Sequence, residues 1–291
     1  MDLSGNQGAG FELIKMLYPT GAKIYMASRS KELAEEAIQN IVATDPNGAS
    51  RLKFLHLDLD DLNIVRTAAK TFAEQETRLD ILWQNAGIGG APVGSKTKHG
   101  FEAHMGINVI GPFYFSQLLY PQLKAAALAS PQGSVRVVWT SSHMSETVAP
   151  QGGYVLADIE KGGASSHFMN YATSKACNWI LADEMGKRWG NDGIVSVVQN
   201  PGGLDTHIYH TQPRLMMFFF RMILYPPKMG AYTELFAGLS PEISEKTQGA
   251  YVIPWGRILE RVPRPDIYEA LESGKGRELW DWIEGQIKLH V

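Results

Sequence analysis

Tyr171 and Lys175 are separated by four positions in a stretch, 171–189, whose apolar pattern predicts a helix. Residues four apart lie on one face of a helix, so the lysine ammonium can lie near the phenol. A nearby positive charge lowers a phenol pKa towards the range in which it works as a general acid or base. Such pairs also occur by chance on helix surfaces, so the pair indicates a site only together with further catalytic residue types.

Further polar residues of the right kind lie at predicted strand ends and in a helix. Ser142 and Asn85 each follow a predicted strand, and Asn108 lies within a predicted helix. The carboxyl ends of parallel strands meet at one edge of a doubly wound sheet, which is where such folds bind ligands. We therefore expect these side chains to join the tyrosine and the lysine in one site, to which we assign no metal.

Two features near the N-terminus concern a cofactor. Gly8 and Gly10 precede a helical pattern, where they would let amides approach a pyrophosphate at the positive end of a helix dipole, or would simply form a tight turn. Arg29, beside two serines after a predicted strand, suits the 2′-phosphate of NADP, whereas NAD would favour an acidic residue there. The alternative is an exposed arginine at a serine-capped helix start. NADP is therefore the favoured cofactor.

Short apolar runs alternate with helical patterns along the chain, which predicts βαβ units. The expected strands are 23–27, 52–57, 81–84, 135–141, 194–199 and 251–254. The expected helices are 12–18, 32–43, 62–75, 101–127, 171–189, 231–237 and 277–288. Right-handed crossovers then give an α/β fold with a doubly wound, mainly parallel, Rossmann-like sheet in a single domain over 1–291. Only four residues precede Gly5, so the N-terminal strand is expected to be missing or reduced.

The composition limits the classes of molecule that this protein is expected to bind. A net charge of −3 gives no general attraction to nucleic acid, so a small molecule is favoured. One cysteine and the absence of a signal-peptide pattern make a cytoplasmic location the default. The apolar segment 215–225 is too short to span a bilayer, which leaves a packed helix, a lid over an apolar substrate, or, as a distant third, a membrane-surface contact. The long helices 101–127 and 171–189 are candidate surfaces for a homo-oligomer.

Five motifs occur together and in order. They are Asn85-Ala86-Gly87, Asn108-Val109-Ile110-Gly111, Ser142, the stretch from Tyr171 to Lys175, and Asn200-Pro201-Gly202. With them the chain resembles the short-chain dehydrogenase/reductase family from about Gly5 to its end. Its ending 252–257 is similar to that of fungal, retinol-dehydrogenase-like members.

The resemblance implies a role for each matching residue. Tyr171 would exchange a proton with an alcohol or carbonyl, Ser142 would position its oxygen, Lys175 would bind the nicotinamide ribose and tune the tyrosine, and Asn108 would hold a relay water. Four further positions would contact the cofactor: Asp58 and Leu59 near the adenine, Asn85 below the cofactor, and Thr206 near the carboxamide. Asp58 has an alternative role in capping the helix that starts after it.

The start of the chain departs from that family, because Ser4 stands in place of the first loop glycine and Gly5 is joined directly to Asn6, as though a strand between them had been excised. An altered coding sequence, an expression artefact and a natural loss of part of the nucleotide site all remain open.

Our main hypothesis is an NADP(H)-dependent oxidoreductase acting on an apolar alcohol or carbonyl compound, with secondary metabolites as a candidate class. The first alternative is a redox-neutral isomerase, lyase or cyclase that uses Tyr171 and Ser142. The second is a non-catalytic partner subunit, which is disfavoured because Asn108, Ser142, Tyr171 and Lys175 would then have no chemical role.

Overall fold

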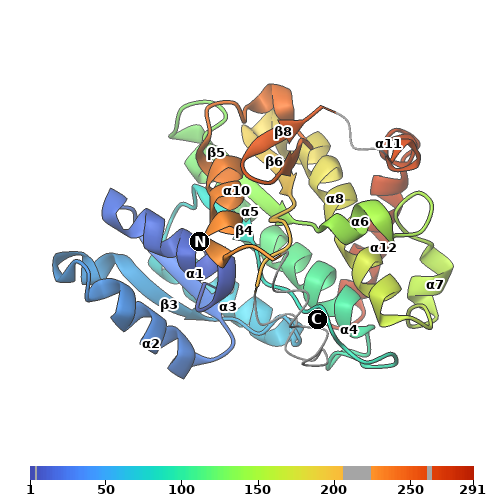
Figure 1. Cartoon of the computed structure of the whole chain (residues 1–291), viewed down its shortest axis with the longest axis horizontal. Helices are drawn as coiled ribbons and strands as arrows, with labels where there is room; N and C mark the ends of the chain where they lie inside the picture. The colour runs from blue at the N-terminus through green and yellow to red at the C-terminus, as the bar shows by residue number, and fades with distance from the viewer. Residues whose placement is uncertain (4, 206–223, 261–263) are drawn as a thin grey trace.

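A computed structural model describes residues 1–3, 5–205, 224–260 and 264–291. Figure 1 shows one central sheet covered by helices on both faces. The strands are β1 Asp2–Leu3, β2 Ile24–Ser28, β3 Leu52–His56, β4 Ile81–Gln84, β5 Val135–Thr140, β6 Ile194–Gln199, β7 Tyr251–Ile253 and β8 Arg257–Leu259. Their order is β3-β2-β1-β4-β5-β6-β7-β8, with all neighbours parallel except β7 and β8. The predicted doubly wound α/β fold is confirmed.

The helices fall into two layers. On one face α1, α2 and α10 bury residues against the sheet, and on the other α3, α5 and α8 do so, with α12 packed outside α8. The helices are α1 Gly8–Leu17, α2 Lys31–Val42, α3 Leu62–Gln75, α4 Ala103–Met105, α5 Gly111–Leu128, α6 His143–Thr147, α7 Leu156–Glu160, α8 His167–Trp189, α10 Pro227–Leu239, α11 Pro265–Glu272 and α12 Lys275–Lys288. Short 3₁₀ turns span Tyr18–Thr20, Pro46–Arg51, Gly190–Asp192 and Glu245–Thr247, and a π-helix spans Gly106–Ile110.

The predicted long helix 101–127 is therefore wrong in detail, because the π-helix separates α4 from α5. A π-turn often marks a functional position in a helix. The predicted helix 171–189 begins earlier, at His167, where the Ser166 side chain caps it. Parallel sheets place these strand and helix ends on one side, where the site is expected.

Helix α12 lies on the faces of α5 and α8 that the sequence offered for subunit pairing. Trp280 of α12 is buried, and its ring meets that of Phe113 of α5 edge to face at a centroid distance of 4.6 Å. The guanidinium of Arg188 of α8 lies 4.6 Å from the centre of the same Trp280 ring. Part of this surface is thus covered within one chain.

Strand β1 is present but reduced to two residues. It occupies the centre of the sheet, with Asp2 and Leu3 aligned to Met26 and Ala27 of β2 and Asp2 aligned to Trp83 of β4. The strand precedes the glycine loop, so the expected gap between Gly5 and Asn6 is not found. At its amino end β1 begins with Asp2, next to the buried Met1.

A cavity of about 550 Å³ lies beside this amino end. Apolar side chains of the flanking elements line it, among them Ile24, Tyr25, Phe72, Ile81 and Trp83. β1 pairs with Met26 and Ala27 of β2, so the first two residues of β2, Ile24 and Tyr25, have no partner in β1. The space thus has the place and the surroundings of the amino half of a central strand.

This cavity predicts the effect of a longer strand. A Val-Ile-Val segment joined ahead of Met1 should raise the free energy of unfolding by about 2 kcal/mol, because apolar side chains would be buried and strand edges paired. Chemical denaturation measures the change. A Gly-Ser-Gly segment is the matched control and should give no gain; equal stability of the two variants would show that the cavity does not accept a strand.

Candidate active site

Lys175 is the buried centre of the site. Its Nζ donates a hydrogen bond of 3.0 Å to the carbonyl oxygen of Thr140, the last residue of β5. Burial lowers the pKa of Lys175 to about 8. A Cβ on Gly87 would lie 3.2 Å from Nζ, so a side chain at position 87 would crowd the ammonium. The strand end and the glycine together make room for a positive charge at the edge of the sheet.

Tyr171 lies one turn before Lys175 on α8, as the spacing predicted. The lysine Nζ is 5.7 Å from the centre of the tyrosine ring. On another side the buried His104 ring meets Tyr171 edge on, with centroids 6.1 Å apart. His104 is itself held by buried Glu102, at 2.7 Å. The sequence analysis missed this pair, since two polar residues in a helical pattern look like an exposed helix face.

Asn108 lies in the π-helix and braces the loop after β4. Its Oδ1 accepts from the Ile88 amide at 2.8 Å, and its Nδ2 donates to the Ile88 carbonyl and to Ser174 Oγ, both at 3.0 Å. The side chain is buried. It therefore connects α8 with the segment that carries Asn85 and Gly87, and its implied role in holding a water stays a prediction.

Ser142 follows β5 and caps the short helix α6. Its Oγ accepts from the Met144 amide at 3.2 Å, and the residue is half-buried. No described residue accepts a hydrogen bond from this hydroxyl, so its proton can be donated to a bound oxygen. The structure brings Ser142, Tyr171, Lys175 and Asn108 to the edge of the sheet where the carboxyl ends of β4 and β5 lie.

The two glycines of the predicted loop lie in the first turn of helix α1, which begins at Gly8. Gly8 has a φ of +62°, which favours glycine, and its amide and that of Ala9 donate to no described residue. A Cβ on Gly10 would lie 2.5 Å from Asn85 Nδ2 and 2.5 Å from Asp2 Oδ1. Gly8 therefore keeps amides available at a helix start, whereas Gly10 permits close packing.

Two buried carboxyl groups lie beneath this loop. Desolvation raises the pKa of Asp2 to about 8 and that of Glu234 well above its usual range. With its amide oriented to satisfy both ends, Asn85 donates to Glu234 Oε1 at 2.9 Å and accepts from the Gly10 amide at 3.1 Å. Burial thus favours the protonated form of these acids, which lessens their repulsion of an anion at the loop. The donor set at the start of α1 thus fits a pyrophosphate.

The remaining residues predicted to bind the cofactor differ in their exposure and contacts. Arg29 is exposed after β2 and makes no ion pair with a described residue, while Ser30 caps α2 through the Leu33 amide. Asp58 accepts from the Asp60 amide at 3.1 Å, but the residue that caps α3 is Asp61. Leu59 is buried, with its carbonyl 2.9 Å from where a Cβ on Gly111 would lie. Thr206 and most of the segment 215–225 lie outside the described residues.

Comparison with known proteins decides the family. The family model for short chain dehydrogenases matches residues 3–155. The chain is 50% identical over 290 residues to a short-chain dehydrogenase/reductase, iacJ, of Pestalotiopsis fici, with 98% of this chain and 88% of the relative covered. The chain belongs to the short-chain dehydrogenase/reductase family. A second family member, bet4 of Neocamarosporium betae, is 39% identical, with 100% of this chain and 88% of the relative covered.

Solved structures of this fold agree with the sheet topology. A putative uncharacterized protein from Mycobacterium paratuberculosis superimposes with a TM-score of 0.67 at 24% identity, covering 96% of this short-chain dehydrogenase/reductase and 92% of that chain. Salutaridine reductase from Papaver somniferum gives 0.66 at 20% identity, with 86% and 98% covered. At these identities the likeness concerns the fold alone. Within the described part of the chain, no helix is both long and apolar enough to cross a membrane.

The buried lysine of this family member predicts a pH dependence. The pKa of Lys175 is about 8 in the folded chain and about 10.5 in the unfolded one, so the unfolded chain binds the extra proton between those values. The free energy of unfolding, relative to Lys175→Met, should therefore rise by about 3 kcal/mol from pH 7.5 to 10.5. Denaturant titrations of both proteins at each pH measure it. Lys288→Met, at an exposed position of α12, is the control, and a pH-independent difference for Lys175→Met would contradict the shift.

Proposed function

We propose that this family member is an NADP(H)-dependent oxidoreductase that interconverts an alcohol and a ketone or aldehyde on an apolar small molecule. The observation that carries the proposal is the buried Lys175 ammonium 5.7 Å from the Tyr171 ring, with the Ser142 hydroxyl on the same side of the sheet. A protonated phenol supported by a cation is suited to exchange a proton with an alcohol oxygen at neutral pH. Membership of a dehydrogenase family adds to this reading.

The proton chemistry follows from the side chains. In the reducing direction the Ser142 hydroxyl donates a hydrogen bond to the carbonyl oxygen, and the Tyr171 hydroxyl transfers its proton to that oxygen. The Lys175 ammonium stabilises the resulting phenolate. In the oxidising direction the phenolate takes the proton back from the alcohol. Bound NADPH would supply the hydride that the carbonyl carbon accepts.

The cofactor would be held by groups on both sides of β1. The amides of Gly8 and Ala9 suit the pyrophosphate, and the exposed Arg29, which has no ion-pair partner among the described residues, suits a 2′-phosphate. Asp58 and Leu59 would lie near the adenine, Asn85 below the cofactor, and Thr206 near the carboxamide. Among proteins of similar fold, RhlG of Pseudomonas aeruginosa forms a complex with NADP and a 3-ketoacyl-(acyl-carrier-protein) reductase of Brucella melitensis one with NADH, so the choice of NADP rests on Arg29.

The substrate class is proposed from the sequence between 213 and 226, where three consecutive phenylalanines follow the Asn200-Pro201-Gly202 motif. A segment this rich in apolar side chains, following that motif in the sequence, suits an apolar substrate, and secondary metabolites are one such class. The redox-neutral alternative was motivated by a missing central strand. Since β1 is present and pairs on both sides, no observation now favours that alternative.

Tyr171→Phe tests the reaction. It removes one hydroxyl and little volume, so turnover should fall at least about a hundredfold while the fold is retained. NADPH oxidation with a panel of apolar ketones and aldehydes measures turnover, and circular dichroism monitors the fold. Near-normal turnover in this variant would remove Tyr171 from the mechanism.

Arg29→Ala tests the cofactor preference. The affinity for NADPH should fall about tenfold to a hundredfold, because a charge-assisted contact to the 2′-phosphate is lost, while the affinity for NADH should barely change. Titration of both nucleotides, followed by fluorescence, gives the two dissociation constants. Lys31→Ala, two positions away and also exposed, serves as the control. Equal weakening of both nucleotides by Arg29→Ala would assign Arg29 a structural role.

A further inference from the structure

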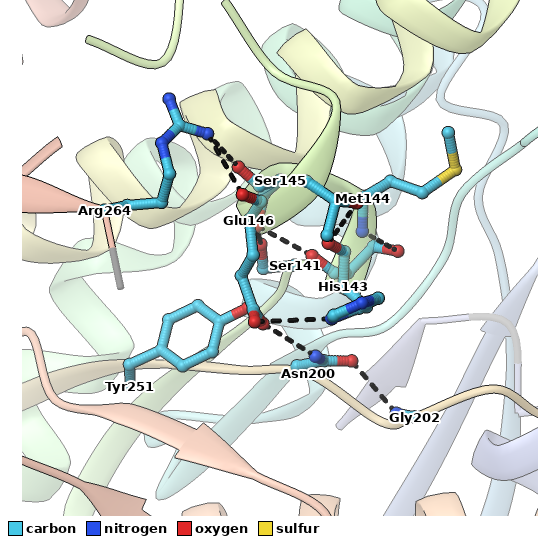
Figure 2. A network of polar contacts seen from close by, with 11 residues as sticks. Ser141, His143, Met144, Ser145, Glu146, Asn200, Gly202, Tyr251 and Arg264 are labelled. Atoms are coloured by element: carbon cyan, nitrogen blue, oxygen red, sulfur yellow. Dashed lines mark hydrogen bonds and ion pairs between the residues drawn. The ribbon is translucent and has the colours of Figure 1, made fainter. Parts of the chain in front are cut away.

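The carboxylate of Glu146, on α6, accepts hydrogen bonds from two distant parts of the chain and also lies close to a histidine of its own helix. Its Oε1 accepts from Asn200 Nδ2 at 3.0 Å and from the Tyr251 hydroxyl at 2.7 Å. Its Oε2 lies 3.3 Å from His143 Nδ1. Figure 2 shows these side chains converging on the one carboxylate.

These contacts join elements that are distant in sequence. Glu146 lies four positions after Ser142, which caps the same short helix. Asn200 follows β6, and its Oδ1 accepts from the Gly202 amide at 3.0 Å, which fixes the turn of the Asn200-Pro201-Gly202 motif. Tyr251 begins β7. One carboxylate thus links the serine-bearing helix to that turn and to the next strand.

The linkage is largely shielded from water. The Glu146 side chain is 13% exposed, and Asn200 and Tyr251 are buried. Burial, followed by the nearby Glu146 charge, raises the pKa of Tyr251 well above its ordinary value, so the phenol remains a hydrogen-bond donor at working pH. Hydrogen bonds to a charged acceptor in such surroundings are the stronger kind.

Helix α6 depends on outside contacts, because a helix of five residues is not stable by itself. Arg264 supports its backbone separately, donating to the carbonyl oxygens of Ser145 and Pro150, both at 2.9 Å. Among the described residues, Arg264 donates no hydrogen bond to Asn200 or Gly202. It therefore supports the helix without connecting it to the turn, and Glu146 supplies the connection.

We propose that Glu146 is a positioning residue that holds Ser142 and the Asn200-Pro201-Gly202 turn in a fixed mutual placement. The kinetic consequence rests on the proposed oxidoreductase function, whereas the linkage itself does not. Displacement of a reacting group by about 1 Å can cost a hundredfold in rate. Loss of the carboxylate should therefore impair chemistry more than cofactor binding.

Hydrogen exchange on the unliganded protein tests the linkage directly. Glu146→Ala should speed exchange about tenfold or more at the amides of both Met144 and Gly202. Glu146→Gln should stay close to wild type, because its amide oxygen can still accept from Asn200 and Tyr251. Arg264→Ala is the matched control, with faster exchange at Met144 but not at Gly202. An unchanged Gly202 amide in Glu146→Ala would overturn the proposal, and so would an equally large change in Glu146→Gln.

Kinetics gives a second, separate readout. Glu146→Ala should lower kcat about tenfold to a hundredfold with an NADPH dissociation constant within about twofold of wild type, and Glu146→Gln should restore kcat. A fall in NADPH affinity that matches the fall in kcat would overturn the positioning role. If Glu146→Ala does not fold, Tyr251→Phe removes one donor and should speed Gly202 exchange by a smaller factor, and no change would refute the linkage. If the wild-type chain transfers no hydride, the proposed function fails, while the exchange result still decides the role of Glu146.

Discussion

The carbonyl oxygen of Thr140, at the end of strand β5, accepts hydrogen bonds from two side chains of α8. Lys175 Nζ and Asn178 Nδ2 both donate to it at 3.0 Å. All six residues of β5 are buried between β4 and β6, so this oxygen cannot move without disturbing the centre of the sheet. The placement of Tyr171, and with it the chemistry of the site, depends on this attachment of a helix to a strand end.

The sequence predicts most of the frame. Strands 81–84 and 194–199 and helix 62–75 begin and end where expected, because each is an apolar run or an amphipathic stretch with a clear polar boundary. The site residues on these frames are brought together because parallel strands end at one edge. Strand β8 and helices α6, α7 and α11 were not predicted. Each has at most eight residues, and elements this short are determined by tertiary partners more than by their own pattern.

The side-chain pairs around the site could not be predicted either. Glu146 and Tyr251 are 105 positions apart, and no local pattern announces their contact. The same holds for Asp2 and Glu234, two acids that lie in different elements and meet only through the folded sheet. Glu102 and His104 are near in sequence, but their burial beside Tyr171 depends on the packing of α4 against α8. Sequence patterns locate helices and strands, whereas hydrogen-bond networks depend on how those elements pack together.

The cavity beside the amino end of β1 has a consequence for how this protein responds to its surroundings. It is lined largely by apolar side chains of the folded sheet and its helices, and it ceases to exist when the chain unfolds. A small apolar compound that enters it binds the native state alone. By mass action such a compound stabilises the fold by RT ln(1 + [L]/Kd), about 2.7 kcal/mol at a hundredfold excess over Kd. A compound bound there would raise the thermal midpoint of this chain from a position away from its catalytic edge.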